Sequence, residues 1–340
     1  MPLRGSAAPL TQAYDTALLD LDGVVYIGPD AVAGAAEALG AARAAGMRLA
    51  FVTNNAFRPA AAVAAHLVEL GVPARPEDVV TSAQAAARVV ASLVAPGSPV
   101  LVVGGAGLEE ALRERALVPV QSADANPAAV VQGFSPQLTW ELLAEGALAV
   151  ARGVPWVAAN LDSTIPVPRG RAPGNGALVA VIRVATGREP VAVAGKPELP
   201  LHRESIERVA ARRPLVVGDR LDTDIEGAVR GGTDSLLVLT GVTTPQLLLA
   251  APPHRRPTYL APSVRGLMTT HPPVTSESGR WRCGGWEAGI EQGQLLLEGD
   301  GDPYDGLRAA CAVTWSASDP AAATPAVAAA GALARLDLPG

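Results

Sequence analysis

Two aspartates two positions apart, Asp20 and Asp22, interrupt an otherwise apolar run in the stretch LLDLDGVVY at residues 18–26. Side chains at positions i and i+2 of a strand point to the same side, so the two carboxylates are expected to lie together. Two like charges this close are costly unless a cation binds between them or one carboxyl group is protonated. A turn-forming Asp-Gly pair explains Asp22 before Gly23, but it does not explain Asp20. The pattern favours a site for chemistry at this point.

A second acidic cluster follows a later apolar run, in GDRLDTDIEGA at residues 218–228. Its carboxylates belong to Asp219, Asp222, Asp224 and Glu226. The spacing resembles the start of an EF-hand calcium loop, but the twelfth position holds Thr233 instead of a bidentate glutamate. We therefore expect Asp219 to join Asp20 in binding a hard divalent cation, Mg²⁺, with water completing the octahedron.

Two further polar features could bind a phosphate group. Thr53, Asn54 and Asn55 end another apolar run, where a hydroxyl and the following backbone N–H groups can hold phosphate oxygens. The same residue types also favour helix caps and turns, so this segment alone does not decide. Lys196 is the only lysine among 27 lysines and arginines, and its compact ammonium group suits a transferring phosphoryl group. An exposed loop lysine is the alternative.

The elements that position these residues follow an α/β pattern, in which short apolar runs alternate with alanine-rich helical stretches. Helices are predicted over residues 32–46 and 59–70. Strands are predicted over residues 16–20, 47–53, 99–103, 155–159, 190–194, 214–218 and 235–239. Asp20, Thr53, Lys196 and Asp219 come at or just after the carboxyl ends of four of these strands. Ligands bind outside those ends in open α/β sheets, so the four side chains are expected to converge.

Four segments, DLDGVVY, FVTNNA, GKP and GDRLDTDI, resemble the motifs of the haloacid dehalogenase superfamily of phosphohydrolases. The resemblance is nearest to its class IIA branch, which includes nitrophenylphosphatase, phosphoglycolate phosphatase and glycerol-3-phosphate phosphatase. It covers about residues 14–268. It implies a Rossmann-like, three-layer core with a parallel sheet at residues 14–81 and 187–268, and an inserted α/β cap domain at 82–186. A Pro/Ser-rich linker (269–280) and a small C-terminal extension (281–340) lie outside the resemblance.

The resemblance also implies a role for each site residue. Asp20 would be the nucleophile that forms an aspartyl-phosphate, and Asp22 the general acid and base. Mg²⁺ would be bound by Asp20, the main-chain carbonyl of Asp22, and Asp219. Asp224 would orient either Lys196 or a water on the metal. The phosphoryl oxygens would be bound by Thr53, Asn54, Asn55 and Lys196.

In the cap, Asn160 and Asp162 are candidates for contact with the leaving group, because closure of a cap completes such sites. A polar turn after the predicted strand 155–159 explains these residues equally well. A second cap feature, Gly105 and Gly107 in VLVVGGAGLEE at 100–110, resembles a dinucleotide fingerprint. It lacks the third small residue and the downstream acidic partner, so we expect an ordinary strand–turn–helix.

The function expected from this resemblance is hydrolysis of a small phosphorylated metabolite by a Mg²⁺-dependent phosphatase. Glycerol 3-phosphate and 2-phosphoglycolate are the first substrates to consider. Pyridoxal phosphate, a nucleotide or a phosphosugar would suit the same chemistry. A phospholigand-binding protein without turnover is a different class, and the presence of every motif residue argues against it.

Composition limits the partners and the location. A net charge of −6 without a basic run argues against nucleic acid. No apolar run reaches the roughly 20 residues that a membrane span needs, and a cytoplasmic location is expected. Two distant cysteines suggest neither a disulfide nor a zinc site. A homo-oligomer is compatible with the sequence, which does not fix the oligomeric state. In the extension, residues 281–299 are expected to form a hairpin and residues 303–318 a helix, with packing favoured over a small-ligand role.

Overall fold

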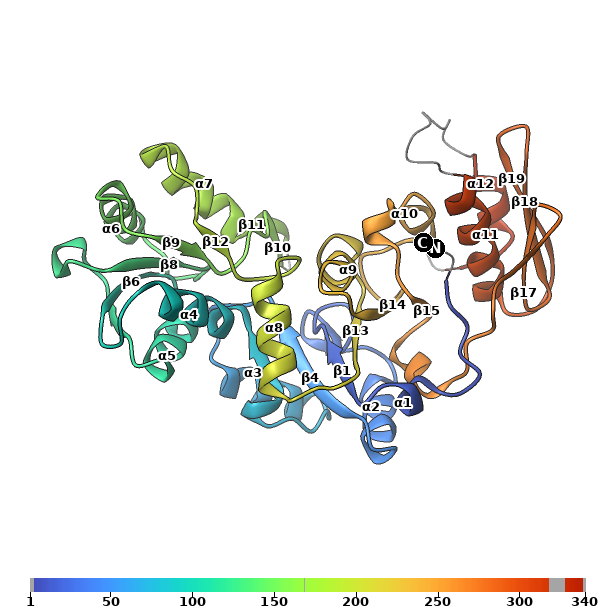
Figure 1. Ribbon diagram of the computed structural model, residues 1–340, viewed down its shortest axis with the longest axis horizontal. Coiled ribbons are helices and arrows are strands. Elements are labelled where there is room, and N and C mark those ends of the chain that lie inside the picture. Colours follow the sequence, from blue (N-terminus) through green and yellow to red (C-terminus); the bar gives the residue numbers. More distant parts are fainter. Residues whose placement is uncertain (1–2, 168, 318–327, 339–340) are drawn as a thin grey trace. The chain divides into compact units, whose positions relative to one another are not determined.

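The protein was analysed as a computed structural model in which residues 3–167, 169–317 and 328–338 are described. By its internal contacts the chain forms two compact units, each considered by itself below. Unit 1 consists of Met1–Leu49 and Arg212–Gly340, and unit 2 of Ala50–Ala211. Figure 1 shows the helices and strands of both units along the chain. Residues 318–327 and 339–340 of the predicted C-terminal extension lie outside the described residues.

Unit 1 contains four parallel strands in the order β15-β14-β13-β1. Their bounds are β1 Thr16–Leu19, β13 Pro214–Gly218, β14 Asp234–Val238 and β15 Tyr259–Ala261. Nearly every residue of these strands is buried and most are apolar, as expected of a parallel sheet. The other strands and α-helices before residue 270 are β2 Tyr26–Ile27, β3 Asp30–Ala31, α1 Leu10–Ala13, α2 Ala35–Ala44, α9 Glu226–Arg230 and α10 Pro245–Leu249.

The C-terminal extension forms an antiparallel sheet followed by a helix, which confirms the predicted hairpin and helix. The strands are β16 Thr275–Glu277, β17 Arg280–Cys283, β18 Trp286–Glu291 and β19 Gln294–Gly299, in that order across the sheet. The helices are α11 Pro303–Ala317 and α12 Ala330–Ala334.

The extension shares one hydrophobic core with the parallel sheet of unit 1. Leu237, Leu248 and Leu260 of the sheet region belong to the same buried cluster as Trp286 and Trp315 of the extension. Polar contacts follow the same interface: the Trp315 indole donates to Leu248 O at 3.3 Å, and the buried Arg308 guanidinium donates to Leu260 O at 2.5 Å. The extension therefore packs against the parallel sheet of unit 1, and a packing role in place of a small-ligand role stays a prediction.

Both cysteines lie in this shared core, and neither forms a disulfide. Burial raises the pKa of the Cys283 thiol to about 12 and also raises the pKa of Cys311. A thiol with a raised pKa stays protonated at pH 8 and is a poor nucleophile. We expect iodoacetamide at pH 8 to leave both thiols unlabelled in the native protein and to label both in denaturant, as read by mass spectrometry. Rapid labelling of the native protein would contradict the packing described here.

Unit 2 contains a five-stranded parallel sheet in the order β12-β9-β8-β6-β7. The bounds are β6 Pro99–Val103, β7 Val118–Val120, β8 Ala129–Gln132, β9 Trp156–Ala158 and β12 Ala192–Val193. Helices α6 Trp140–Ala151 and α7 Asn175–Thr186 lie on one face, and α4 Ser82–Leu93 and α5 Ala106–Glu114 lie on the other (Figure 1).

The other elements of unit 2 begin with β4 Arg48–Thr53, which pairs in parallel with β5 Val79–Thr81 and whose last four residues belong to the unit. The rest are α3 Ala60–Glu69, the hairpin β10 Thr164–Val167 with β11 Gly170–Pro173, and α8 Leu199–Arg208. The predicted strand at 190–194 shortens to β12, since Pro190 has no N–H for a ladder and Val191 is exposed. Before residue 270 the predictions missed the short strands β5, β7, β8, β10 and β11 of unit 2 and β2, β3 and β15 of unit 1.

Candidate active site

Three carboxylates of unit 1 lie together: Asp20, Asp219 and Asp224 each offer one oxygen within 4.8 Å of the others. Asp20 directly follows β1, and Asp219 directly follows β13. Because Leu19 pairs with Val217 in the parallel ladder, the two strands end side by side, and residues 199 positions apart meet. Asp219 and Asp224 are each only 1% exposed, while Asp20 is half-buried.

Asp219 is fixed by the backbone around it. Its Oδ2 accepts a hydrogen bond from Val242 N at 2.7 Å, and its carbonyl accepts from Thr243 N at 3.2 Å. A Cβ on Gly241 would lie 2.0 Å from this Oδ2, and one on Gly23 would lie 2.5 Å from it. Two glycines therefore let the backbone approach the carboxylate closely, and Gly23 also has a positive φ of 81°.

The three carboxylates fit a hard divalent cation. Oxygen ligands are those that Mg²⁺ and Ca²⁺ prefer, and like charges this close are stabilised when a cation lies between them. The Asp224 carboxylate lies in this group, and its expected role of orienting Lys196 or a water on the metal stays a prediction. Residues 221–225 form a π-helical turn that places Asp224 close to Gly218: a Cβ there would be 2.2 Å from the Asp224 Cβ.

Asp22 was expected to lie on the same side of a strand as Asp20, and the structure places it elsewhere. Strand β1 ends at Leu19, so strand periodicity does not extend to Asp22. The chain turns there, with Gly23 N donating to Tyr26 O at 2.8 Å, and the Asp22 side chain is exposed. Its carboxylate is not part of the cluster of three. The general acid and base role, and the main-chain contact with the metal, stay predictions.

The other acidic residues of segment 218–228 pair with arginines. Asp222 accepts from Arg220 at 3.0 and 2.8 Å; burial raises the pKa of this carboxyl group, but the hydrogen bonds and charge of Arg220 outweigh burial and lower it. Glu226 is ion-paired with Arg230 and Arg255. These pairs engage two of the three carboxylates that the EF-hand alternative would use, and residues 221–230 are helical, so the structure argues against a calcium loop here.

A second group of predicted residues lies in unit 2, around the side chain of Asn54. The Asn54 amide donates to Lys196 O at 3.2 Å and to Asp162 Oδ2 at 3.2 Å, and its Oδ1 accepts from Lys196 N at 2.8 Å. The Lys196 ammonium donates to Val52 O at 3.3 Å. The structure thus joins the end of β4 to the segment containing the lysine. The side chain of Asn54 positions Lys196, a role that the sequence did not suggest.

Thr53 and Asn55 shape the same turn. Thr53 is buried, and its hydroxyl accepts from Asn55 N at 3.1 Å. The Asn55 side-chain oxygen accepts from Phe57 N at 2.8 Å and from Arg58 N at 3.1 Å. These are the turn contacts that the alternative interpretation anticipated, and they leave the phosphate-binding roles of Thr53, Asn54 and Asn55 as predictions.

Asn160 also serves this group. It is buried, its amide donates to Asn54 O at 2.8 Å, and its Oδ1 accepts from Asp162 N at 3.1 Å. Contact of Asn160 and Asp162 with a leaving group stays a prediction. Two contributors were missed: the Ser82 hydroxyl donates to Asn54 O at 2.5 Å, and Asn175 donates to Asn160 O at 2.7 Å. In the sequence both residues look like ordinary helix starts.

Comparison with known proteins identifies the family that the four sequence motifs resemble. Residues 17–117 match the haloacid dehalogenase-like hydrolases, residues 193–267 a related hydrolase-like family, and residues 283–338 a GCN5-related N-acetyltransferase-like domain. D-glycerol 3-phosphate phosphatase of Mycobacterium tuberculosis is 50% identical over 258 residues, which are 76% of this chain and 72% of that protein. Acid sugar phosphatase of Staphylococcus aureus is 39% identical over 233 residues, 68% of this chain and 88% of that protein.

Solved structures agree. A glycerol phosphate phosphatase from Mycobacterium tuberculosis, solved in complex with magnesium, aligns with a TM-score of 0.85 at 44% identity over 92% of this chain and 94% of that one. A p-nitrophenyl phosphatase from Archaeoglobus fulgidus aligns with a TM-score of 0.69 at 28% identity over 75% of this chain and 98% of that one. The chain belongs to the haloacid dehalogenase-like hydrolases and is an enzyme of their phosphatase group.

Proposed function

We propose that this chain is a Mg²⁺-dependent phosphatase that hydrolyses glycerol 3-phosphate. The observation that supports the chemistry is the cluster of Asp20, Asp219 and Asp224, in which a half-buried carboxylate stands beside two buried ones. The substrate is proposed from the relative that is 50% identical, a D-glycerol 3-phosphate phosphatase. In the part of the chain that the structure describes, no helix is long and apolar enough to cross a membrane.

The reaction proceeds in two steps at Asp20. A carboxylate oxygen of Asp20 attacks phosphorus, the ester P–O bond breaks, and Asp22 gives a proton to the departing glycerol oxygen. Water then attacks phosphorus of the aspartyl-phosphate, Asp22 takes the proton of that water, and inorganic phosphate leaves with Asp20 restored. Mg²⁺ would be held by Asp20, Asp219, Asp224 and the Asp22 carbonyl, and it would supply positive charge that offsets repulsion between the nucleophile and the phosphate.

Thr53, Asn54 and Lys196 hold the phosphoryl oxygens in this scheme. The Lys196 ammonium supplies the positive charge, and the Thr53 hydroxyl with the Asn54 backbone N–H supplies hydrogen-bond donors. Fixed donors cost little reorganisation during the reaction, so the hydrogen bonds between Asn54 and the Lys196 backbone contribute by holding the lysine in place.

The test is release of inorganic phosphate from a panel: both enantiomers of glycerol 3-phosphate, 2-phosphoglycolate, pyridoxal phosphate, a nucleotide and several sugar phosphates. Turnover of a glycerol 3-phosphate enantiomer is expected to exceed the others in kcat/KM and to disappear with EDTA, because the carboxylate cluster then repels the substrate phosphate. Addition of Mg²⁺ should restore it. Release that persists without divalent cations would overturn the proposed mechanism.

A phosphosugar is the second candidate substrate, since acid sugar phosphatase is 39% identical over most of its length. The same panel separates the two: preference for a sugar phosphate would replace glycerol 3-phosphate and leave the chemistry intact. Binding of phosphate without release from any ester would identify a phospholigand-binding protein instead.

A further inference from the structure

The loop of residues 54–58, which follows β4, is enclosed by the carboxyl ends of strands in the five-stranded sheet of unit 2. Asn160, just after β9, donates to Asn54 O at 2.8 Å. Gly107, in the first turn of the helix that follows β6, donates its N–H to Phe57 O at 2.9 Å. Ala56 is only 2% exposed and lies against Gly133, just after β8. The crevice at this edge of an α/β sheet is the usual place for a ligand. Here the loop of the same chain occupies it.

Glycines make room for this loop. A Cβ on Gly105 would lie 2.4 Å from Cδ2 of the Phe57 ring. One on Gly107 would lie 2.6 Å from Ala56 O and 2.9 Å from Arg58 O, and one on Gly133 would lie 2.9 Å from the Ala56 Cβ. The glycine run that resembles a dinucleotide fingerprint therefore admits backbone of the same chain where a pyrophosphate would approach. The backbone N–H of Gly107, in the first turn of α5, donates to the carbonyl of Phe57.

We propose that Gly105, Gly107 and Gly133 form a socket that positions the phosphate-binding residues. The inference rests on the proposed function, because it takes Thr53, Asn54 and Lys196 as the groups that bind the phosphoryl oxygens. Only one residue separates Asn54 from Ala56, which the socket encloses. The Asn54 side chain in turn bonds both backbone polar groups of Lys196. A shift of the enclosed residues is passed on to Asn54 and from there to Lys196.

Gly105→Ala is the decisive variant, because its new Cβ meets a side chain that can be trimmed. The clash displaces Phe57, and we expect KM for the substrate and the inhibition constant of inorganic phosphate to rise together by about tenfold, since small misplacements of binding groups cost this much or more. Phe57→Ala removes the ring in question. The double variant Gly105→Ala with Phe57→Ala should bind phosphate better than Gly105→Ala alone, a non-additivity expected only of groups in contact.

Gly146→Ala, on helix α6 where it packs against the same sheet, is the matched control. Its Cβ would lie 2.5 Å from Val103 Cγ2 and 3.0 Å from Ile182 Cδ1, against the other face and away from residues 54–58. It should lower the melting temperature and leave KM and the phosphate inhibition constant unchanged. Equal shifts of KM in the Gly105 and Gly146 variants would mean that the socket affects only the stability of the fold, and they would overturn the proposal. So would an unchanged KM in folded Gly105→Ala, or a double variant no better than the single one.

Two outcomes require other readouts. If Gly105→Ala does not yield folded protein, Phe57→Ala alone makes the test: emptying the socket of its ring should weaken phosphate binding severalfold, and unchanged binding would refute the inference. If the wild-type enzyme releases no phosphate from any ester, the proposed function fails. The socket is then judged by calorimetric titration with inorganic phosphate, where Gly105→Ala must still bind more weakly than Gly146→Ala.

Discussion

Replacement of Asp20 by asparagine is expected to lower phosphate release by about a thousandfold or more, the scale on which removal of a covalent nucleophile acts. An amide oxygen does not attack phosphorus to form an aspartyl-phosphate, and the shape of the side chain is otherwise kept. The loss should appear in kcat at saturating substrate and Mg²⁺, measured as inorganic phosphate released over time.

The same substitution should not unfold the protein. It removes one of three carboxylates whose oxygens lie within 4.8 Å of each other, so the repulsion among them without metal decreases. The melting temperature in EDTA is therefore expected to stay the same or rise. Asp30→Asn, an exposed aspartate of β3, is the matched control and should keep wild-type turnover. More than a tenth of wild-type activity in Asp20→Asn, with its mass verified, would show that another group is the nucleophile.

The residues of the site that could be predicted from the sequence are those that directly follow an apolar strand. Asp20 and Asp219 follow apolar strands directly, and the carboxyl ends of parallel strands meet at one edge, so their proximity was predicted without knowledge of the strand order. Asp224 was harder to place, because its carboxylate joins the cluster through a π-helical turn. Such turns have no simple sequence period.

Contacts between distant segments could not be predicted in the same way. The side chain of Asn54 reaches residues 108 and 142 positions later in the chain, and its sequence context indicates only a turn. Gly105 and Gly107 were expected to form an ordinary strand–turn–helix, and their sequence context does not indicate that residues 56–58 pack against them. In the extension, the hairpin at residues 281–299 was expected from its sequence, yet the apolar side chains there do not indicate which core they join.

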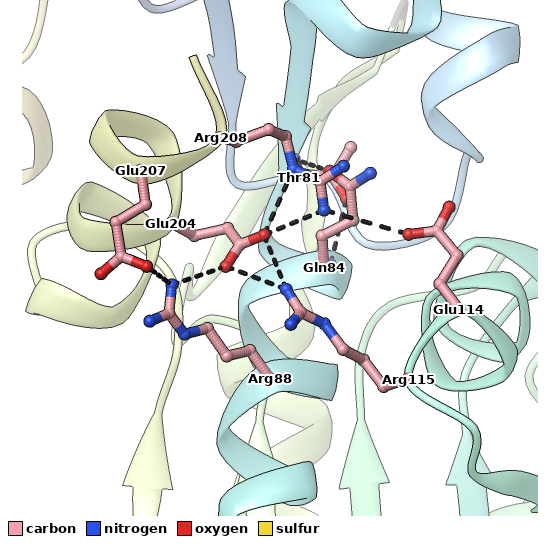
Figure 2. Close-up of polar contacts among 8 residues, drawn as sticks. All are labelled: Thr81, Gln84, Arg88, Glu114, Arg115, Glu204, Glu207 and Arg208. Carbon is pink, nitrogen blue, oxygen red and sulfur yellow. Dashed lines mark hydrogen bonds and ion pairs between the residues drawn. The ribbon is translucent and has the colours of Figure 1, made fainter. Parts of the chain in front are cut away.

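Glu204 is a residue whose importance only the structure shows, and its removal is expected to have a large effect on stability. Figure 2 shows its buried carboxylate on α8 between three guanidinium groups. Arg88 of α4 lies at 3.1 Å, Arg115 at the end of α5 at 3.0 Å, and Arg208 of α8 at 2.9 Å from the nearest carboxylate oxygen. Glu204→Ala leaves three cations facing each other without this carboxylate. We expect the free energy of unfolding to fall by about 3–5 kcal/mol, the cost of breaking a buried ion pair.

Glu207→Ala is the matched control for this prediction. Glu207 lies one turn further along α8 and also pairs with Arg88, but its side chain is 57% exposed (Figure 2). Exposed pairs contribute at most about 1 kcal/mol, so its removal should change the free energy of unfolding by no more than that. Urea titration followed by circular dichroism measures both variants. Similar losses in the two would mean that burial of Glu204 adds nothing.

The position of Glu204 also connects stability with the residues proposed to bind phosphate. The three elements that it joins begin beside them: α4 at Ser82, which bonds Asn54 O, α5 just after Gly105, and α8 shortly after Lys196. Loss of the ion pairs between Glu204 and the three arginines should let these helix starts move, so KM of Glu204→Ala is expected to rise even at temperatures where the variant is fully folded. Glu204→Gln keeps an acceptor oxygen for the arginines and should show an intermediate KM. Wild-type KM in a folded Glu204→Ala would show that the ion pairs stabilise the helices without positioning their amino ends.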